Sequence, residues 1–188
     1  MRKAVRMNPA VKILPHYTFS EWETWEGQWE LIEGIPYAMG TLPVPRHQQI
    51  AASLTAEFHL QLKNFKRCNT YQPLDYRVSD DIILQPDMLV VCGGITKKYL
   101  DFTPALVAEI LSPGTFLKDR HTKYPIYEAQ HISYYLIVSA EMEEAEVYVL
   151  GNNTYKLDQK GKDFVYRFQF EDGEAAIDFL KFGNPFIP

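Results

Sequence analysis

The sequence predicts an α+β or α/β protein built as a mixed β-sheet flanked by helices. One long amphipathic helix pattern comes early in the chain, at residues 47–66, and a second helix pattern follows at about 117–130. Apolar, strand-like runs lie between these helices and fill the region after the second one. We expect one domain over residues 1–188, with a core at about 18–150 and a strand-rich C-terminal extension over 151–188.

The composition is that of an ordinary soluble protein. Its 188 residues are 46% hydrophobic and 23% charged, which suffices for a sizeable core. The net charge is −5, from 24 acidic residues against 19 lysines and arginines. This balance argues against a dedicated nucleic-acid binder, although an enzyme can still touch phosphate in a local basic groove. Because no signal-like segment or membrane-length apolar run is present, we expect a cytoplasmic protein.

The first third of the chain predicts a hairpin and one long helix. Residues 29–39 predict a hairpin that turns at Glu33-Gly34. From 47 to 66, apolar residues recur every three or four positions and form one stripe along a helix. His47 falls on the same inward face, in the first turn. The stripe consists of Ile50, Leu54, Phe58, Leu62 and Phe65.

The most informative residues are two acids placed at two apolar strands. Asp87 leads into the apolar run 88–92, and Glu109 lies inside the apolar run 105–111. The two acids are 22 positions apart (109 − 87). A carboxylate in such a place is costly unless something neutralises it. A divalent cation held between the two would do so, and it would supply Lewis acidity for phosphate chemistry.

The second helix pattern carries three polar residues on one face. Asp119, Lys123 and Tyr127 recur every fourth residue between about 117 and 130, so they share one side of a helix. Pro125 interrupts that pattern. We therefore expect a kink or a fresh helix start near Lys123.

The rest of the chain is rich in strands. The acids between Glu141 and Glu146 are expected to form a solvated turn. Two cysteines, Cys68 and Cys92, are too few for a disulfide framework, and Cys92 is expected to be a small buried hydrophobic residue. The expected strands cover 70–79, 134–138, 145–150, 154–157 and 164–170, with a strand or turn at 175–182.

At these residues the chain resembles the bacterial putative restriction endonuclease family, within the PD-(D/E)XK nuclease superfamily. Pro86-Asp87 followed by Glu109-Ile110-Leu111 is similar to the superfamily signature, with Leu111 at the position of the usual lysine. No single piece is specific, but the order and spacing of six pieces is. The pieces are Trp29–Gly34, Pro45–His47, Gln85–Asp87, Val107–Pro113, Asp119–Tyr127 and Tyr134–Val138.

The resemblance implies a restriction-endonuclease-like fold, with a mixed sheet between helices and additional antiparallel strands at both ends. It also implies Mg²⁺-dependent hydrolysis of DNA phosphodiester bonds, with Mn²⁺ as a possible substitute for Mg²⁺. A lysine from the following helix would replace the missing one. Lys123, which comes 14 residues after Glu109 (123 − 109), is the candidate.

The roles implied for the site residues follow from metal and phosphate chemistry. Asp87, Glu109 and the Ile110 carbonyl would bind Mg²⁺, which prefers oxygen ligands. Lys123 would orient the attacking water or stabilise charge on the phosphate. Candidates for supporting or substrate-contacting roles are Glu30, His47, Asp119 and Tyr127.

Each of these residues also has a structural interpretation. Asp87 could simply begin a strand, and Glu109 could form a structural ion pair with Lys123. His47 could cap its helix, and Glu30 could face solvent. The matching alternative for the whole protein is a catalytically degenerate relative that acts as a binding or assembly module. The acidic charge and the missing lysine favour this alternative, whereas the retained acids favour the nuclease.

We also expect a homodimer. Nucleases that cut duplex DNA often use two-fold symmetry, because the two strands are related by it. The C-terminal strands are expected to offer apolar surface beyond the needs of the core. The aromatic residues concerned are Tyr148, Tyr155, Phe164, Tyr166, Phe168 and Phe170.

Overall fold

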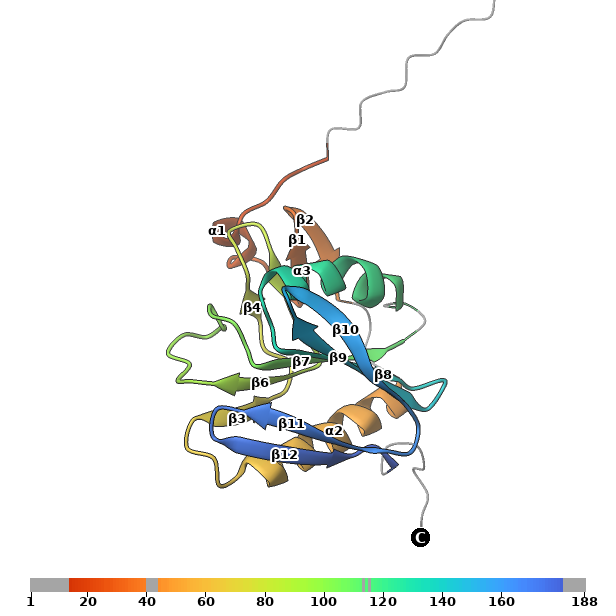
Figure 1. The fold of residues 1–188 in the computed structure, drawn as a ribbon. Helices are drawn as coiled ribbons and strands as arrows, with labels where there is room; N and C mark the ends of the chain where they lie inside the picture. The colour runs from red at the N-terminus through yellow and green to blue at the C-terminus, as the bar shows by residue number, and fades with distance from the viewer. Residues whose placement is uncertain (1–13, 40–43, 113, 115, 181–188) are drawn as a thin grey trace, which may run out of the picture.

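A mixed six-stranded sheet forms the centre of the protein (Figure 1). The computed structural model describes residues 14–39, 44–112, 114 and 116–180. The central strands β7 and β8 run parallel, and every other neighbouring pair in this sheet is antiparallel. The predicted mixed sheet is therefore confirmed. In spatial order the strands are β10 (Thr154–Gly161), β9 (Glu144–Gly151), β8 (Tyr134–Ser139), β7 (Leu106–Leu111), β6 (Met88–Cys92) and β3 (Cys68–Tyr71).

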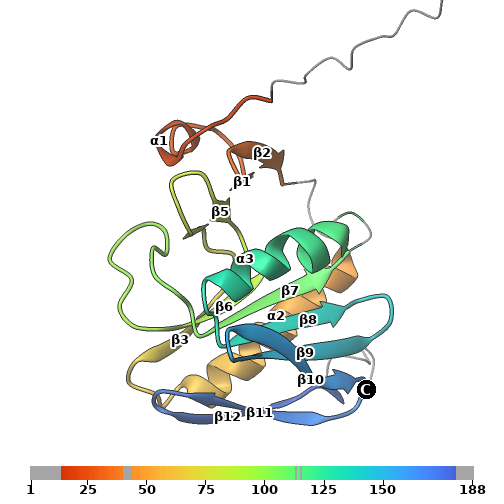
Figure 2. The same cartoon turned by 45° about the horizontal axis from the view of Figure 1, so that its top comes forward.

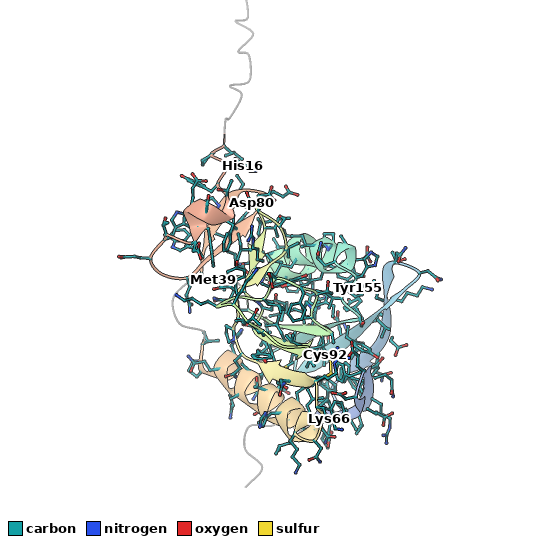
Figure 3. All side chains as sticks on the ribbon, turned by 90° about the vertical axis from the view of Figure 1, so that its left-hand side faces the viewer. His16, Met39, Lys66, Asp80, Cys92 and Tyr155 are labelled. Atoms are coloured by element: carbon teal, nitrogen blue, oxygen red, sulfur yellow. A yellow bond between two sulfur atoms is a disulfide. The ribbon has the colours of Figure 1, made fainter. Side chains whose placement is uncertain are left out.

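Helices cover the two faces of this sheet (Figure 2). Helix α2 (Pro45–Leu62) packs its apolar stripe on one face, against residues such as Ala108 and Ile110. It begins two residues earlier and ends four residues earlier than the sequence predicts. The opposite face is covered by η1 (Lys118–Lys123) and α3 (Tyr124–Ala129). Tyr155, labelled in Figure 3, belongs to the core on that second face.

The expected irregularity near Lys123 is confirmed, and it takes the form of a change of helix type. Residues of η1 form a π-helix, and an α-helix begins at Tyr124. Pro125 lies in the first turn of α3, where a missing N–H costs little. The connection between the parallel strands β7 and β8 therefore runs through η1 and α3.

A smaller four-stranded sheet lies beside the main one and carries the N-terminal hairpin. The predicted turn at Glu33-Gly34 is confirmed, and both residues have positive φ, of 52° and 75°. The short helix α1 (Phe19–Trp22) packs near this sheet through Phe19. The expected strand at 70–79 is two separate strands, because β4 belongs to the small sheet. Its strands in order are β2 (Ile35–Ala38), β1 (Trp29–Ile32), β5 (Ile83–Leu84) and β4 (Tyr76–Arg77).

The C-terminal strands contribute to the main core. Strand β10 pairs with β9 and forms the edge of the main sheet, while β11 (Val165–Phe170) and β12 (Gly173–Asp178) form a separate hairpin. Phe168 of this hairpin is fully buried against the same core as α2. The expectation of surplus aromatic surface was wrong for Phe168 and Tyr155, which are buried, and the other four aromatic residues pack partly buried against the core. Of the last expected element, residues 181 and 182 lie outside the described residues.

The two cysteines form a disulfide that ties β3 to β6. Cys68 lies directly opposite Cys92 in the antiparallel register of these strands. The interpretation of Cys92 as a plain buried hydrophobic residue was therefore wrong. Strand pairing brings together two residues whose separation of 24 positions carries no pairing signal.

None of the helices in the described ranges is long and apolar enough to cross a membrane.

Candidate active site

The two acids singled out in the sequence lie next to each other across two strands. Asp87 immediately precedes β6, and Met88 of β6 pairs with Ala108 of β7. Continuing this register by one position would set Asp87 opposite Glu109, although Asp87 itself lies just outside β6. Glu109 is 2% exposed and lies on the face that η1 and α3 cover. The side chain of Asp87 contacts His47 of α2 and the backbone N–H of Ile110, and its charge contributes to the raised pKa of Glu109.

Glu109 is held by two donors from the covering helices. The ammonium of Lys123 lies 2.8 Å from its Oε1, and the hydroxyl of Tyr127 donates to the same oxygen at 2.7 Å. Lys123 is 2% exposed and Tyr127 is fully buried. Burial raises the pKa of Glu109 well above its usual value, and the neighbouring acids add to this effect against the opposing charge of Lys123.

Lys123 connects three acids. Its Nζ lies 2.8 Å from Oε1 of Glu30, as close as it lies to Glu109, and 3.5 Å from Oδ1 of Asp119. Burial alone would lower the pKa of Lys123, but the three carboxylates outweigh burial and raise it well above the ordinary value. The lysine therefore stays charged inside the protein.

Glu30 is fully buried, so the possibility that it faces solvent was wrong. Lys118 and Lys123 contact its two oxygens, and the backbone N–H of Gln85 donates to Oε1 at 3.0 Å. Burial raises the pKa of Glu30, yet the two lysines outweigh burial and the net shift is downward. Strand β1 of the small sheet thereby contributes an ionised carboxylate to the site on the main sheet.

His47 reaches Asp87 from the first turn of α2. Its Nε2 lies 3.2 Å from Oδ2 of Asp87, and the N–H of Ile110 donates to that same oxygen at 2.7 Å. Burial alone would lower the pKa of His47, but the hydrogen bond and charge of Asp87 raise it. Ile110 thus contacts Asp87 through its N–H, and the metal-binding role expected of its carbonyl stays a prediction.

Sequence reasoning missed Lys118 and a second buried cluster. Glu146 is 3% exposed and lies in β9, so its assignment to a solvated turn was wrong. Arg120 binds both of its oxygens, at 2.7 and 2.9 Å, and Tyr148 and Lys160 also donate to it. The alternation of Ala145, Glu146 and Val147 in an apolar strand was the signal that could have found it.

The acid cluster around Glu109 has more carboxylates than ammonium groups. It contains four carboxylates, of Glu30, Asp87, Glu109 and Asp119, but only two ammonium groups, of Lys118 and Lys123. The hydrogen bonds described above engage Oδ2 of Asp87 and Oε1 of Glu109, one oxygen of each carboxylate. Among the described residues, no group of three or more His, Cys, Asp or Glu side chains has the arrangement of a metal site. Mg²⁺ commonly binds through one or two carboxylates and keeps several waters, so two acids suffice for it.

Comparison with known proteins identifies a family and a similar fold. The family model described as "Uma2: Putative restriction endonuclease" matches residues 17–169. The fold is similar to the crystal structure of a putative nuclease belonging to DUF820 from Anabaena variabilis, with a TM-score of 0.67 and 16% sequence identity. That similarity covers 79% of this chain and 87% of the other chain. The search of curated proteins found no match.

Proposed function

The chain belongs to the Uma2 family of putative restriction endonucleases, and on this premise we propose that it is a metal-dependent endonuclease that hydrolyses DNA phosphodiester bonds. The observation that carries the proposal is the buried cluster around Glu109. It combines two neighbouring acids, Asp87 and Glu109, with a lysine from the following helix in direct contact. Because Leu111 stands at the position of the usual lysine, a lysine from elsewhere in the chain would have to take over its role, and Lys123 is placed to do so.

Asp87 and Glu109, with the carbonyl of Ile110, would hold Mg²⁺ or Mn²⁺. When bound, the ion would make a coordinated water more acidic and would polarise the phosphate. His47 and the Ile110 N–H orient the Asp87 carboxylate, and Tyr127 orients Glu109 in the same way. These partners restrict the rotation of both acids, which favours a preorganised site.

Lys123 would act on the phosphate or on the attacking water. Its ammonium is buried among three carboxylates, so it is positively charged at neutral pH and carries three donors. A positive group placed before the reaction begins stabilises the negative charge that develops during phosphate attack. Glu30, held by Lys118 and Gln85, fixes the other side of this ammonium.

The test compares three carboxylate variants for metal binding, melting temperature and nicking of supercoiled DNA. We expect Asp87→Asn and Glu109→Gln to weaken Mn²⁺ binding in calorimetry and to abolish nicking. Glu146→Gln is the matched control, because Glu146 is an equally buried acid in a separate cluster. It should leave metal binding and nicking unchanged.

Failure of the parent protein to bind Mg²⁺ or Mn²⁺ and to nick DNA would refute the proposal and favour the binding or assembly module. The net charge of −5 makes weak, metal-assisted DNA binding the expected behaviour. DNA affinity in the presence of Ca²⁺ can be measured separately from nicking. A homodimer and a cytoplasmic location remain part of the proposal.

A further inference from the structure

A cavity on the N-terminal part of the protein is walled by aromatic rings. It has a volume of about 360 Å³ and is lined by Tyr17, Trp25, Glu26, Trp29 and Pro36. Pockets for small ligands span about 300–1,000 Å³, so this one lies at the lower end of that range. The lining comes from the segments around α1 and from the hairpin β1–β2.

The cavity is separate from the acid cluster but adjoins it through β1. Trp29 and Glu30 are consecutive residues of this strand, and successive side chains of a strand point to opposite faces. Glu30 is fully buried in the acid cluster, while Trp29 lines the cavity. None of the roles proposed above uses Tyr17, Trp25 or Trp29.

The rings form walls at steep angles to one another. Tyr17 and Trp25 have centroids 5.2 Å apart and planes at 83°, and Trp25 and Trp29 have centroids 5.8 Å apart and planes at 71°. A flat base stacks best against parallel faces. These rings contact each other edge to face, and a ring face left open to the cavity attracts a cation, such as an ammonium ion that carries several alkyl substituents.

Hydrogen bonds fix the walls in place. The indole N–H of Trp29 donates to the carbonyl of Glu26 at 2.9 Å, and that of Trp22 donates to the carbonyl of Trp29 at 2.7 Å. The N–H of Tyr17 donates to the carbonyl of Gly34 at 2.8 Å, which ties the residues just before α1 to the hairpin. The cavity is therefore largely preformed, which lowers the entropic cost of binding.

The charge around the cavity selects a cation. Glu26 is its charged lining residue, and the neighbouring cavity is lined by two further acids, Glu23 and Asp75. Over the described part of the chain, no lysine or arginine stacks on the rings of Tyr17, Trp25 or Trp29, although Arg77 stacks on nearby Phe19 at 4.0 Å from its centroid. Among the described residues that line the two cavities, the charged groups are acids, which repel a phosphate, whereas a cation is attracted by both the acids and the ring faces.

We propose that this cavity binds a small organic cation with a quaternary or alkylated ammonium group. The ring faces attract the charge, the apolar edges accept the alkyl groups, and Glu26 supplies the counter-charge. This inference is independent of the nuclease proposal, because it uses none of the same side chains.

The test titrates the full chain with choline chloride and, as the neutral isostere, 3,3-dimethylbutan-1-ol, at matched ionic strength. Indole N–H resonances and tryptophan fluorescence report the binding. We expect saturable shifts of Trp25 and Trp29 with a Kd on the order of 1–10 mM for choline, and at least about tenfold weaker binding of the isostere, because only choline carries the charge.

Variants distinguish recognition of the cation by the rings and Glu26 from general apolar binding in the cavity. Trp25→Ala should abolish binding, and Glu26→Gln should weaken it severalfold. Glu23→Gln is the matched control, since it removes one acid that lines the neighbouring cavity. Trp25→Phe keeps a ring in place and should retain part of the affinity, which guards against a folding defect of the alanine variant.

Two outcomes would overturn the proposal. One is equal affinity for choline and its neutral isostere, which would make the cavity merely apolar. The other is the absence of saturable choline binding by a folded parent protein.

Discussion

The ammonium of Lys123 lies 2.8 Å from the carboxylate of Glu109, and both residues are 2% exposed. Removing one partner of a buried pair leaves an uncompensated charge, which is costly. From the residues alone, this pair could be structural or catalytic, and because it is buried, stability must be measured together with activity.

We expect Lys123→Met to lower the free energy of unfolding by about 3–5 kcal/mol in the absence of metal, because Glu30 and Glu109 then lose their shared cation. Metal binding should persist or tighten, since a nearby positive charge is gone. Nicking should cease. Urea unfolding with and without Mn²⁺ measures the first two effects.

Lys118→Met is the matched control for that variant. Lys118 contacts Glu30 and its side chain is 19% exposed, so its loss should destabilise the protein less. Equal destabilisation by the two variants would contradict the central position assigned to Lys123.

Glu146 should make stability depend on acid pH. Burial raises its pKa, but hydrogen bonds from Arg120, Tyr148 and Lys160 outweigh burial and lower the pKa to about 2. A depressed pKa means that this stabilisation is present above the unfolded-state value, near 4.5, and is lost as the pH falls toward 2. Comparing melting curves of the parent and Glu146→Gln across this range should show a smaller loss of stability in the variant.

The Cys68–Cys92 disulfide should contribute about 2–4 kcal/mol to stability, as expected for a loop of this length. The double variant Cys68→Ala/Cys92→Ala should therefore melt lower than the oxidised parent. Dithiothreitol should lower the melting temperature of the parent and leave that of the variant unchanged.

Counting free thiols in freshly lysed cells also tests the cytoplasmic location, because disulfides are rare in that compartment.

A homodimer should give a mass of twice 21.8 kDa in light scattering. The reason that remains for it is the symmetry of duplex DNA, because the aromatic residues that suggested surplus surface pack in or against the core. A monomeric mass at tens of micromolar protein, both with and without a short DNA duplex, would contradict the predicted homodimer.

Local patterns in the sequence predicted the fold well where one periodicity dominates. The stripe from Ile50 to Leu62 predicted the buried face of α2, and Glu33-Gly34 predicted the hairpin turn. The boundaries of helices and strands were predicted less well. Helix α2 ends at Leu62, because the apolar spacing that continues to Phe65 does not require helical backbone there.

Contacts between distant segments could not be predicted in this way. Lys118 meets Glu30 across 88 residues, and strand register alone brings Cys68 to Cys92. Glu146 was misplaced because a cluster of acids resembles a solvated turn until its basic partners are known. Asp87 and Glu109 could be singled out because a charged residue beside or within an apolar strand departs from the local sequence pattern.

The π-helical form of η1 has a consequence for the spacing of its lysines. Lys118 and Lys123 are five positions apart, yet both contact the carboxylate of Glu30. In an α-helix, with 3.6 residues per turn, five positions would set their side chains about 140° apart around the axis. The wider turn brings both to one side, so that rewinding the same residues into an α-helix without a deletion would separate the pair and leave Glu30 with one cation.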